Sequence, residues 1–160
     1  MRTRNILAPT LVLVLTGLWL ALPAIAAEVP IEKSAKVMAL PAVVQKTVLA
    51  EGAGATVRGV VTEKGEDGAT VYEVEMRIKG LTKDIVVGAD GTVLVSEQQV
   101  TLASIPAAVK TTILKASGKR TIRMIESVTK VGTLEYYEAH VVSGKTVTEV
   151  KVDPDGTLVP

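Results

Sequence analysis

An internal duplication constrains this chain more than any other feature. Shifting the sequence by 65 positions brings its two halves into register. The matching segments are residues 40–44 with 105–109, 56–58 with 121–123, 72–73 with 137–138, and 90–92 with 155–157. Because both copies must satisfy the same backbone plan, one structural unit accounts for most of the architecture. A repeat of this kind specifies a shape but identifies no reaction.

An export signal precedes the duplicated part. Arg2 and Arg4 form a positively charged start, residues 6–22 form an apolar run, and the triplet Ala-Ile-Ala at 24–26 has the small-x-small pattern of a cleavage site. We therefore expect residues 1–26 to be a signal peptide that is cleaved, and the protein to be secreted or periplasmic. The run is short for a spanning helix, which needs about 20 residues, so retention as an anchor is the less favoured alternative. No stable membrane insertion is expected after cleavage.

Charge and composition exclude several classes of partner. The 18 basic side chains lose Arg2 and Arg4 with the signal, which leaves 16 against 17 acidic ones and a formal charge of −1. Nucleic acids and anionic membrane surfaces are usually bound by a basic patch, so nucleic acid is not an expected partner. The chain has no cysteine, which excludes disulfides and a lipid-modified cysteine. Apart from Trp19 in the signal, its only aromatic residues are three tyrosines, so few aromatic interface anchors are available.

Each copy is predicted to begin with a helix. Apolar residues four apart accompany a proline in both copies, and this spacing places them on one side of a helix. Proline is tolerated in the first turn, and glycine commonly ends a helix, so the helices should start at Pro41 and Pro106 and end near Gly52 and Gly118. The apolar positions are Leu40, Val44 and Val48 in the first copy, and Ile105, Val109 and Ile113 in the second.

Strands follow each helix, because the apolar period changes from four to two. Tyr72, Val74, Met76 and Ile78 alternate with charged residues, which is typical of a half-buried strand. Glycine-containing turns divide the remainder into hairpins. The expected strands are 55–63, 70–79, 82–88 and 92–97 in the first copy, and 120–130, 133–143, 145–152 and 157–159 in the second.

The predicted fold class is α+β, a tandem repeat of one helix packed on a four-stranded antiparallel sheet. The chain is divided into the signal peptide at 1–26, a flexible lead at 27–39, the first repeat at 40–100 and the second at 101–160. One helix cannot hide the apolar face of a sheet in a unit of about 60 residues. The two copies are therefore expected to pack together or to share sheet edges.

These features resemble the PepSY-like family, which is grouped with the beta-lactamase-inhibitor-like proteins. The resemblance depends on the Leu-Pro-Ala-x-Val helix start at 40–44, the Tyr-Glu-x-Glu strand at 72–75, the Asp-Gly hairpin at 90–91, and a second copy that begins at a comparable helix. It covers residues 40–160. The resemblance implies an exported fold that binds or restrains another protein, often a peptidase or cell-envelope enzyme, and it implies no catalytic residues. The scarcity of aromatics departs from the aromatic-rich concave sheets of inhibitors of this type.

Charged residues that recur in both copies are the candidates for a binding face. Arg58 recurs as Arg123 and Glu73 as Glu138, and on neighbouring antiparallel strands such residues can share a face and pair. The alternative is a solvated sheet surface, where each ion pair contributes about 0–1 kcal/mol. The predicted partner-binding residues are Arg58, Glu73, Glu75, Arg123, Tyr136, Glu138 and His140.

His140 is the only histidine, and its side chain titrates near neutral pH unless it is perturbed. Strand alternation places it on the same face as Glu138, which can form a dyad with it. A solvent-facing histidine is the main expectation, with pH sensing or ligand contact as the alternative. No nucleophile and base can be assembled, so catalytic residues are not expected. One histidine cannot hold a metal, and the segment 153–156 is predicted to be a hairpin turn rather than a calcium loop, so neither metal nor cofactor is expected.

The sequence thus favours an exported, non-enzymatic binding module that inhibits or restrains an envelope or extracellular protein or peptide. Its mechanism would be occlusion by the sheet surface, with an extended peptide added along an open edge such as the short C-terminal strand as a further mode. The alternative is a periplasmic protein that binds a small ligand or a cation between sheet and helix or between the copies.

Overall fold

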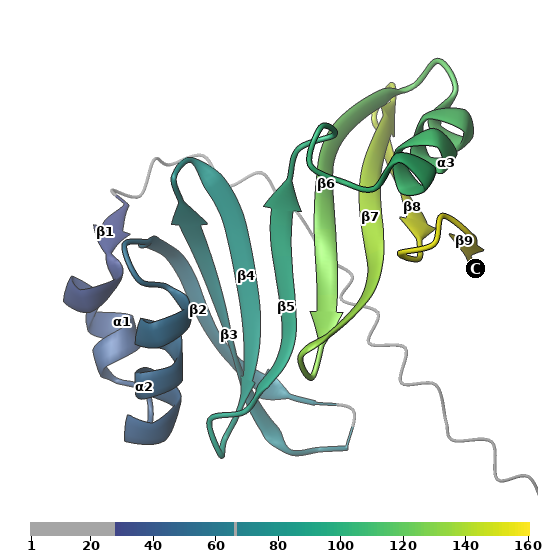
Figure 1. Ribbon diagram of the computed structural model, residues 1–160. Coiled ribbons are helices and arrows are strands. Elements are labelled where there is room, and N and C mark those ends of the chain that lie inside the picture. The colour runs from purple at the N-terminus through teal and green to yellow at the C-terminus, as the bar shows by residue number, and fades with distance from the viewer. Residues whose placement is uncertain (1–27, 66) are drawn as a thin grey trace, which may run out of the picture.

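The computed structural model describes residues 28–65 and 67–160 (Figure 1). The predicted signal peptide lies outside the described residues. The fold is α+β, and its nine strands form one antiparallel sheet in which they lie in the order of the chain. None of the helices in the described ranges has the length and apolar character needed to cross a bilayer.

The strand bounds lie close to the predicted ones. The first half contains β2 (Thr56–Lys64), β3 (Thr70–Ile78), β4 (Leu81–Gly88) and β5 (Val93–Val100). The second half contains β6 (Thr121–Lys130), β7 (Thr133–Ser143), β8 (Thr146–Val152) and β9 (Leu158–Val159). A two-residue strand, β1 (Val29–Pro30), pairs with β2. The helices are η1 (Ile31–Lys33), α1 (Ala35–Met38), α2 (Ala42–Glu51) and α3 (Ala107–Ser117). As expected, α2 and α3 follow their prolines, and Gly52 and Gly118 are the capping residues after their last turns.

Both main helices cover the same face of the sheet (Figure 1). Cross-strand partners lie on one face, and a chain of such partners runs from the residues beneath α2 to those beneath α3. Its members are Met76, Lys83, Gln98, Ser127, Tyr137 and Val152. No helix of the described residues covers the other side of the sheet, which we call the open face.

Two aliphatic cores lie between this covered face and the helices. In the first half, Val44 and Val48 of α2 pack with strand residues that include Val74 and Ile85. In the second half, Val109 and Ile113 of α3 pack with Ile125, Ala139, Val141 and Val152. Each fully buried aliphatic side chain of this size stabilises the fold by about 1.5–3 kcal/mol. The predicted helix positions and the alternation of residues 72–78 are therefore confirmed.

The halves also share a contact between helix and hairpin. The Thr47 hydroxyl donates a hydrogen bond to the carbonyl of Gly91, and the Thr112 hydroxyl donates one to the carbonyl of Gly156, each at 2.7 Å. Both glycines have positive φ, and a Cβ on them would lie 2.8 and 2.7 Å from a side-chain atom of the helix. Glycine is the residue that this conformation and this close approach allow. The Asp-Gly turns are thus held against the helices, and the segment 153–156 forms the predicted turn.

The prediction of a flexible lead is wrong over residues 28–39. This segment forms β1, η1 and α1, and its Ile31 and Val37 are almost completely buried in the first core. The Ile31 N–H donates to the carbonyl of Ala55 at 3.0 Å, which fixes the segment to the start of β2. Elements of two to four residues are too short to show a period, so no regular pattern predicts them.

The sheet also differs from two separate four-stranded units. β5 pairs with β6 from Val95↔Lys130 to Val100↔Ile125, so the two halves share one continuous sheet. Of the two expected arrangements, packing together or sharing sheet edges, the structure has the second. A continuous sheet places the open faces of both halves side by side.

Candidate functional site on the open face

Carboxylates lie opposite one another on neighbouring strands of the open face. Glu75 on β3 is the cross-strand partner of Asp84 on β4, and Asp84 is the partner of Glu97 on β5. Like charges directly opposite each other destabilise a sheet. We call the following group the carboxylate cluster: Glu73, Glu75, Asp84, Glu97, Glu126 and Glu138. Its arrangement opposes stability, so the needs of folding alone do not explain it.

Burial and mutual repulsion shift the protonation of this cluster. Burial raises the pKa of Asp84 to about 7, with further upward contributions from Glu75, Glu126 and Glu73. Burial likewise raises the pKa of Glu97 to about 7, followed by the charges of Glu126 and Glu138. The pKa of Glu73 is also raised, by burial first and then by Glu63 and Glu75. Near neutral pH, part of this cluster therefore still holds protons.

His140 lies between two members of the cluster. Its Nε2 is 3.0 Å from Glu126 Oε2 and 3.2 Å from Glu138 Oε1. One N–H is divided between two oxygens, so neither contact has the alignment of a full hydrogen bond. The contacts with Glu126 and then Glu138 nevertheless raise the pKa of His140 to about 10, against the opposing effect of burial. His140 is therefore a cation at neutral pH.

The expectation of a solvent-facing His140 is wrong, and the contact with Glu138 that strand alternation allowed is present. Its side chain is only 16% exposed because Glu126 and Glu138 flank it from β6 and β7. The register of β6 shifts at Arg123, between Ile122 and Met124, and this shift brings Glu126 to the open face. Simple alternation from Ile122, which lies on the covered face, would place Glu126 beneath α3.

Lys151 on β8 supplies a second cation to this part of the cluster. Its Nζ is 3.3 Å from Glu138 Oε2 and 3.5 Å from Glu149 Oε2. It also lies 5.3 Å from the ring centre of Tyr136, within the range of a cation–π contact. These contacts with His140 and Lys151 lower the pKa of Glu138 below its usual value although burial, the largest single effect, raises it.

An apolar floor adjoins the carboxylates on the same face. Its buried members come from four neighbouring strands, β3 to β6, and Tyr136 on β7 packs against them. Aliphatic stems of lysine or arginine can lie on such a surface while their charged ends reach nearby acids. The members are Val71, Val86, Val95 and Val128, with Leu94 and Tyr136 at the margin.

Most of the predicted site residues come together here. The open face contains Glu73, Glu75, Tyr136, Glu138 and His140. Arg58 and Arg123 are exposed and lie where the registers of β2 and β6 shift. Sequence reasoning missed four residues that complete the site: Asp84, Glu97, Glu126 and Lys151. Alternation within β4 could have indicated Asp84, whereas Glu97 and Glu126 meet only through the pairing of β5 with β6.

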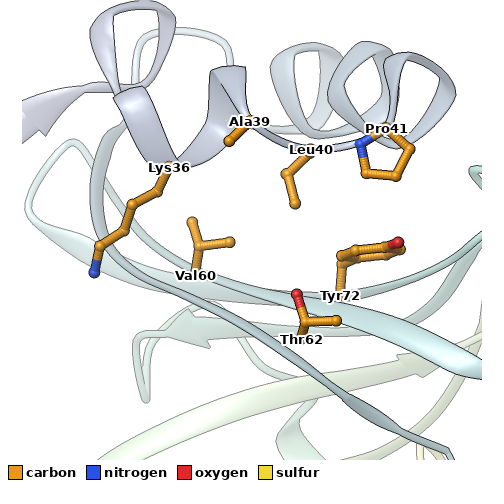
Figure 2. Close-up of a pocket in the computed structure, with 7 residues that line it drawn as sticks. All are labelled: Lys36, Ala39, Leu40, Pro41, Val60, Thr62 and Tyr72. Carbon is orange, nitrogen blue, oxygen red and sulfur yellow. The ribbon is translucent and has the colours of Figure 1, made fainter.

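No group of three or more His, Cys, Asp or Glu side chains within the described ranges is arranged to hold a metal ion. A groove lies between helix and sheet in the first half (Figure 2). It has a volume of about 670 Å³ and opens widely to solvent. Its lining includes Leu40, Val60 and Tyr72.

No family model matches this sequence. No curated protein matches it either. Several solved structures do match this chain, and they have the same fold. A BLIP-like protein from Bacteroides fragilis NCTC 9343 is 14% identical over 76% of this chain and 84% of that chain, with a TM-score of 0.56.

Two further solved structures have the same fold as this chain. A protein of Bacteroides eggerthii DSM 20697 that is proposed to be periplasmic is 14% identical over 76% of this chain and 86% of that chain, with a TM-score of 0.61. A DUF2874 family protein from Bacteroides ovatus ATCC 8483 is 15% identical over 76% of this chain and 85% of that chain, with a TM-score of 0.57. At these identities the likeness establishes the fold, which is the one that the resemblance to beta-lactamase-inhibitor-like proteins implied.

Proposed function

We propose that this protein is an exported, non-enzymatic binding module whose open face captures a cationic segment of an envelope or extracellular protein or peptide. The observation that supports this proposal most is the row of Glu75, Asp84 and Glu97 on three adjacent strands. Such a row is unfavourable without a cation, and a cation from a partner would remove the repulsion. A site whose charges oppose stability is characteristic of function.

The second half of the chain shows how a cation satisfies this surface. At the 65-residue shift, His140 replaces Glu75 and Lys151 replaces Val86. There His140 lies between two carboxylates, and Lys151 contacts Glu138. Two acids of the carboxylate cluster, Glu126 and Glu138, are thus paired with cations of the second half. The partner would supply to Asp84 and Glu97 what His140 and Lys151 supply in the second half.

Lysine and arginine side chains match the chemistry of this surface. Charge-assisted hydrogen bonds to carboxylates are about twice as strong as neutral ones, and they strengthen further where water is partly excluded. The apolar floor at Val86 and Val128 would contact the aliphatic stems. Binding would then occlude the captured segment, which is the mechanism of restraint or inhibition that we propose.

Export is part of the proposal. It is supported by the signal-like residues 1–26 and by a fold that also occurs in a protein proposed to be periplasmic. In that compartment the partner would be an envelope protein or peptide. A periplasm open to small solutes follows the external pH, so the raised pKa values of Asp84 and Glu97 would make capture stronger at pH 8 than at pH 5.

The test is capture from a cell-envelope extract at ordinary salt. Immobilised wild-type protein is compared with Asp84→Asn/Glu97→Gln, which removes two acids from the open face. The matched control is Glu32→Gln/Glu135→Gln, which removes two exposed acids away from the open face. We expect wild type and control to retain the same specific protein and the double variant to lose it. Retention by the double variant, or no specific protein, would contradict the proposal.

The groove beside Leu40 supports the alternative of a small-ligand protein. A thermal-melt screen against metal ions, short basic peptides and cell-wall fragments separates the two, because a ligand that binds only the folded state raises the melting temperature. A shift with basic peptides that Asp84→Asn/Glu97→Gln abolishes supports the open face. A shift with a metal or a cell-wall fragment that this variant retains supports the alternative.

A further inference from the structure

One strand edge is open in the first half although its counterpart in the second half is covered. β6 pairs with β5 along residues 125–130. β2 matches β6 at the 65-residue shift, but β1 pairs only with its Thr56 and Val57. Within the described residues, no strand lies beside residues 58–64 of β2. The unpaired edge of a strand is a template for another extended chain.

Burial at equivalent positions shows what a strand at this edge would cover. Val61 is 47% exposed, whereas its counterpart Glu126 is 5% exposed. Val60 is half-buried, whereas its counterpart Ile125 is 3% exposed. β5 lies beside Ile125 and Glu126, and no described strand lies beside Val60 and Val61. The edge of β2 at residues 58–64 therefore resembles the edge of β6 with its neighbouring strand removed.

The groove of the first half adjoins this edge on the covered side of the sheet. Figure 2 shows Leu40 and Pro41 on the helical side facing Val60, Thr62 and Tyr72 on the strand side. The counterparts of Leu40 and Val60 in the second half, Ile105 and Ile125, are buried. An apolar side chain from an added strand would enter the groove and bury the same surface.

The open-face side of the same edge is acidic. Val61 is the cross-strand partner of Glu73, and Glu63 is close enough to Glu73 to raise its pKa. Side chains of an added strand alternate between the two faces. Those on one side would meet the apolar groove, and those on the other would meet Glu63 and Glu73. Glu63 and Glu73 on one side, and the apolar lining of the groove on the other, thus match a strand in which basic and apolar residues alternate.

We propose that an extended peptide with alternating apolar and basic residues pairs with residues 58–64 of β2 as an antiparallel strand continuing the line of β1. Its apolar side chains occupy the groove, and its basic side chains lie toward Glu63 and Glu73. This inference rests on the proposed function, because the same peptide supplies the cationic segment for the open face. It names the chemical class of the partner and the edge by which it docks.

The probe is a labelled synthetic peptide based on residues 93–102, the segment that contains β5. Its sequence is VLVSKVKVTL, which introduces Glu97→Lys, Gln98→Val and Gln99→Lys. By the register of β5 on β6, the two lysines would lie opposite Glu63 and Val61, and the new valine would face the groove. The control peptide has the same composition with its two lysines adjacent. Binding is measured by fluorescence anisotropy on residues 27–160, the form expected after removal of the signal peptide.

Two matched variants locate the binding edge. Val61→Lys and Val147→Lys add the same charge at open-face valines on opposite edge strands, and each valine is 47% exposed. We expect Val61→Lys to weaken binding at least tenfold and Val147→Lys to change it less than twofold. We also expect the peptide to slow amide hydrogen exchange at residues 58–64, and the control peptide not to do so.

Several results would overturn the inference. These are absence of binding, equal effects of Val61→Lys and Val147→Lys, or amides at 58–64 that are already as protected in the free protein as those of β6. A dimer that excludes the peptide and is dissociated by Val61→Lys would assign the edge to a second copy instead. If Asp84→Asn/Glu97→Gln prevents capture of the envelope partner while Val61→Lys has no effect, the edge inference fails and the proposed function stands.

Discussion

Asp84→Asn should stabilise the protein at pH 8 and change its stability little near pH 4. Burial and the neighbouring carboxylates raise the pKa of Asp84 from 3.8 to about 7. A folded-state pKa above the unfolded value means that the folded protein holds this proton more tightly. The stability that Asp84 contributes is therefore complete below pH 4 and is lost as the pH rises through about 7. Asparagine does not ionise, so the variant avoids this loss.

The magnitude follows from the shift. About three pKa units at 1.36 kcal/mol each give an upper limit of about 4 kcal/mol. Asp84 and Glu97 repel each other, so part of the repulsion is relieved when either one is protonated. Asp84 also keeps some contact with solvent, which screens its charge. We therefore expect a gain in the free energy of unfolding of about 1–3 kcal/mol at pH 8. For a domain of this size such a gain raises the melting temperature by roughly 3–10 °C.

Urea unfolding at pH 4.5 and pH 8 measures this difference directly. The control is Glu135→Gln, because Glu135 is exposed and lies outside the carboxylate cluster. Wild type should lose stability relative to Asp84→Asn between the two pH values, and the control should follow wild type. An equal effect of Asp84→Asn at both pH values, or a destabilisation at pH 8, would refute the argument.

Three further predictions concern the rest of the fold. His140→Ala should lower the free energy of unfolding at pH 7 by about 2–3 kcal/mol, because Glu126 and Glu138 then face each other without a cation between them; no loss in urea unfolding would contradict this. Glu126→Gln should lower the pKa of His140, which an NMR titration measures, since Glu126 contributes most to its rise. Gly156→Ala should lower the free energy of unfolding by about 1–3 kcal/mol and more than Gly54→Ala, because only Gly156 is pressed against a helix; equal losses would contradict this.

Local patterns predicted the parts of this fold that local rules determine. The period of two over residues 72–78 identified both the core side chains and the acids of β3, because β3 keeps its register with β4 throughout. The prolines and glycines located the starts and ends of α2 and α3. The short elements of residues 28–39 were missed because their place depends on the burial of Ile31 and Val37, a tertiary effect.

The candidate site was predicted only in part for a related reason. Glu73 and Glu75 were found because alternation within β3 places them on one face, and Glu138 and His140 because alternation within β7 does the same. Glu126 was missed because a register shift at Arg123 reverses the alternation of β6. The meeting of Asp84, Glu97 and Glu126 depends on which strands pair, and strand pairing is a long-range property that no single segment encodes.

The difference between the halves provides the sharpest test of why carboxylates lie opposite one another on β3, β4 and β5. At the 65-residue shift, His140 occupies in the second half the position of Glu75 in the first. Glu75→His would place an imidazole opposite Asp84, as His140 is placed beside Glu126. We expect this variant to be about 1–2 kcal/mol more stable in urea at pH 6 and to capture less of the cationic partner. Higher stability with undiminished capture would mean that the repulsion among these acids serves no binding function.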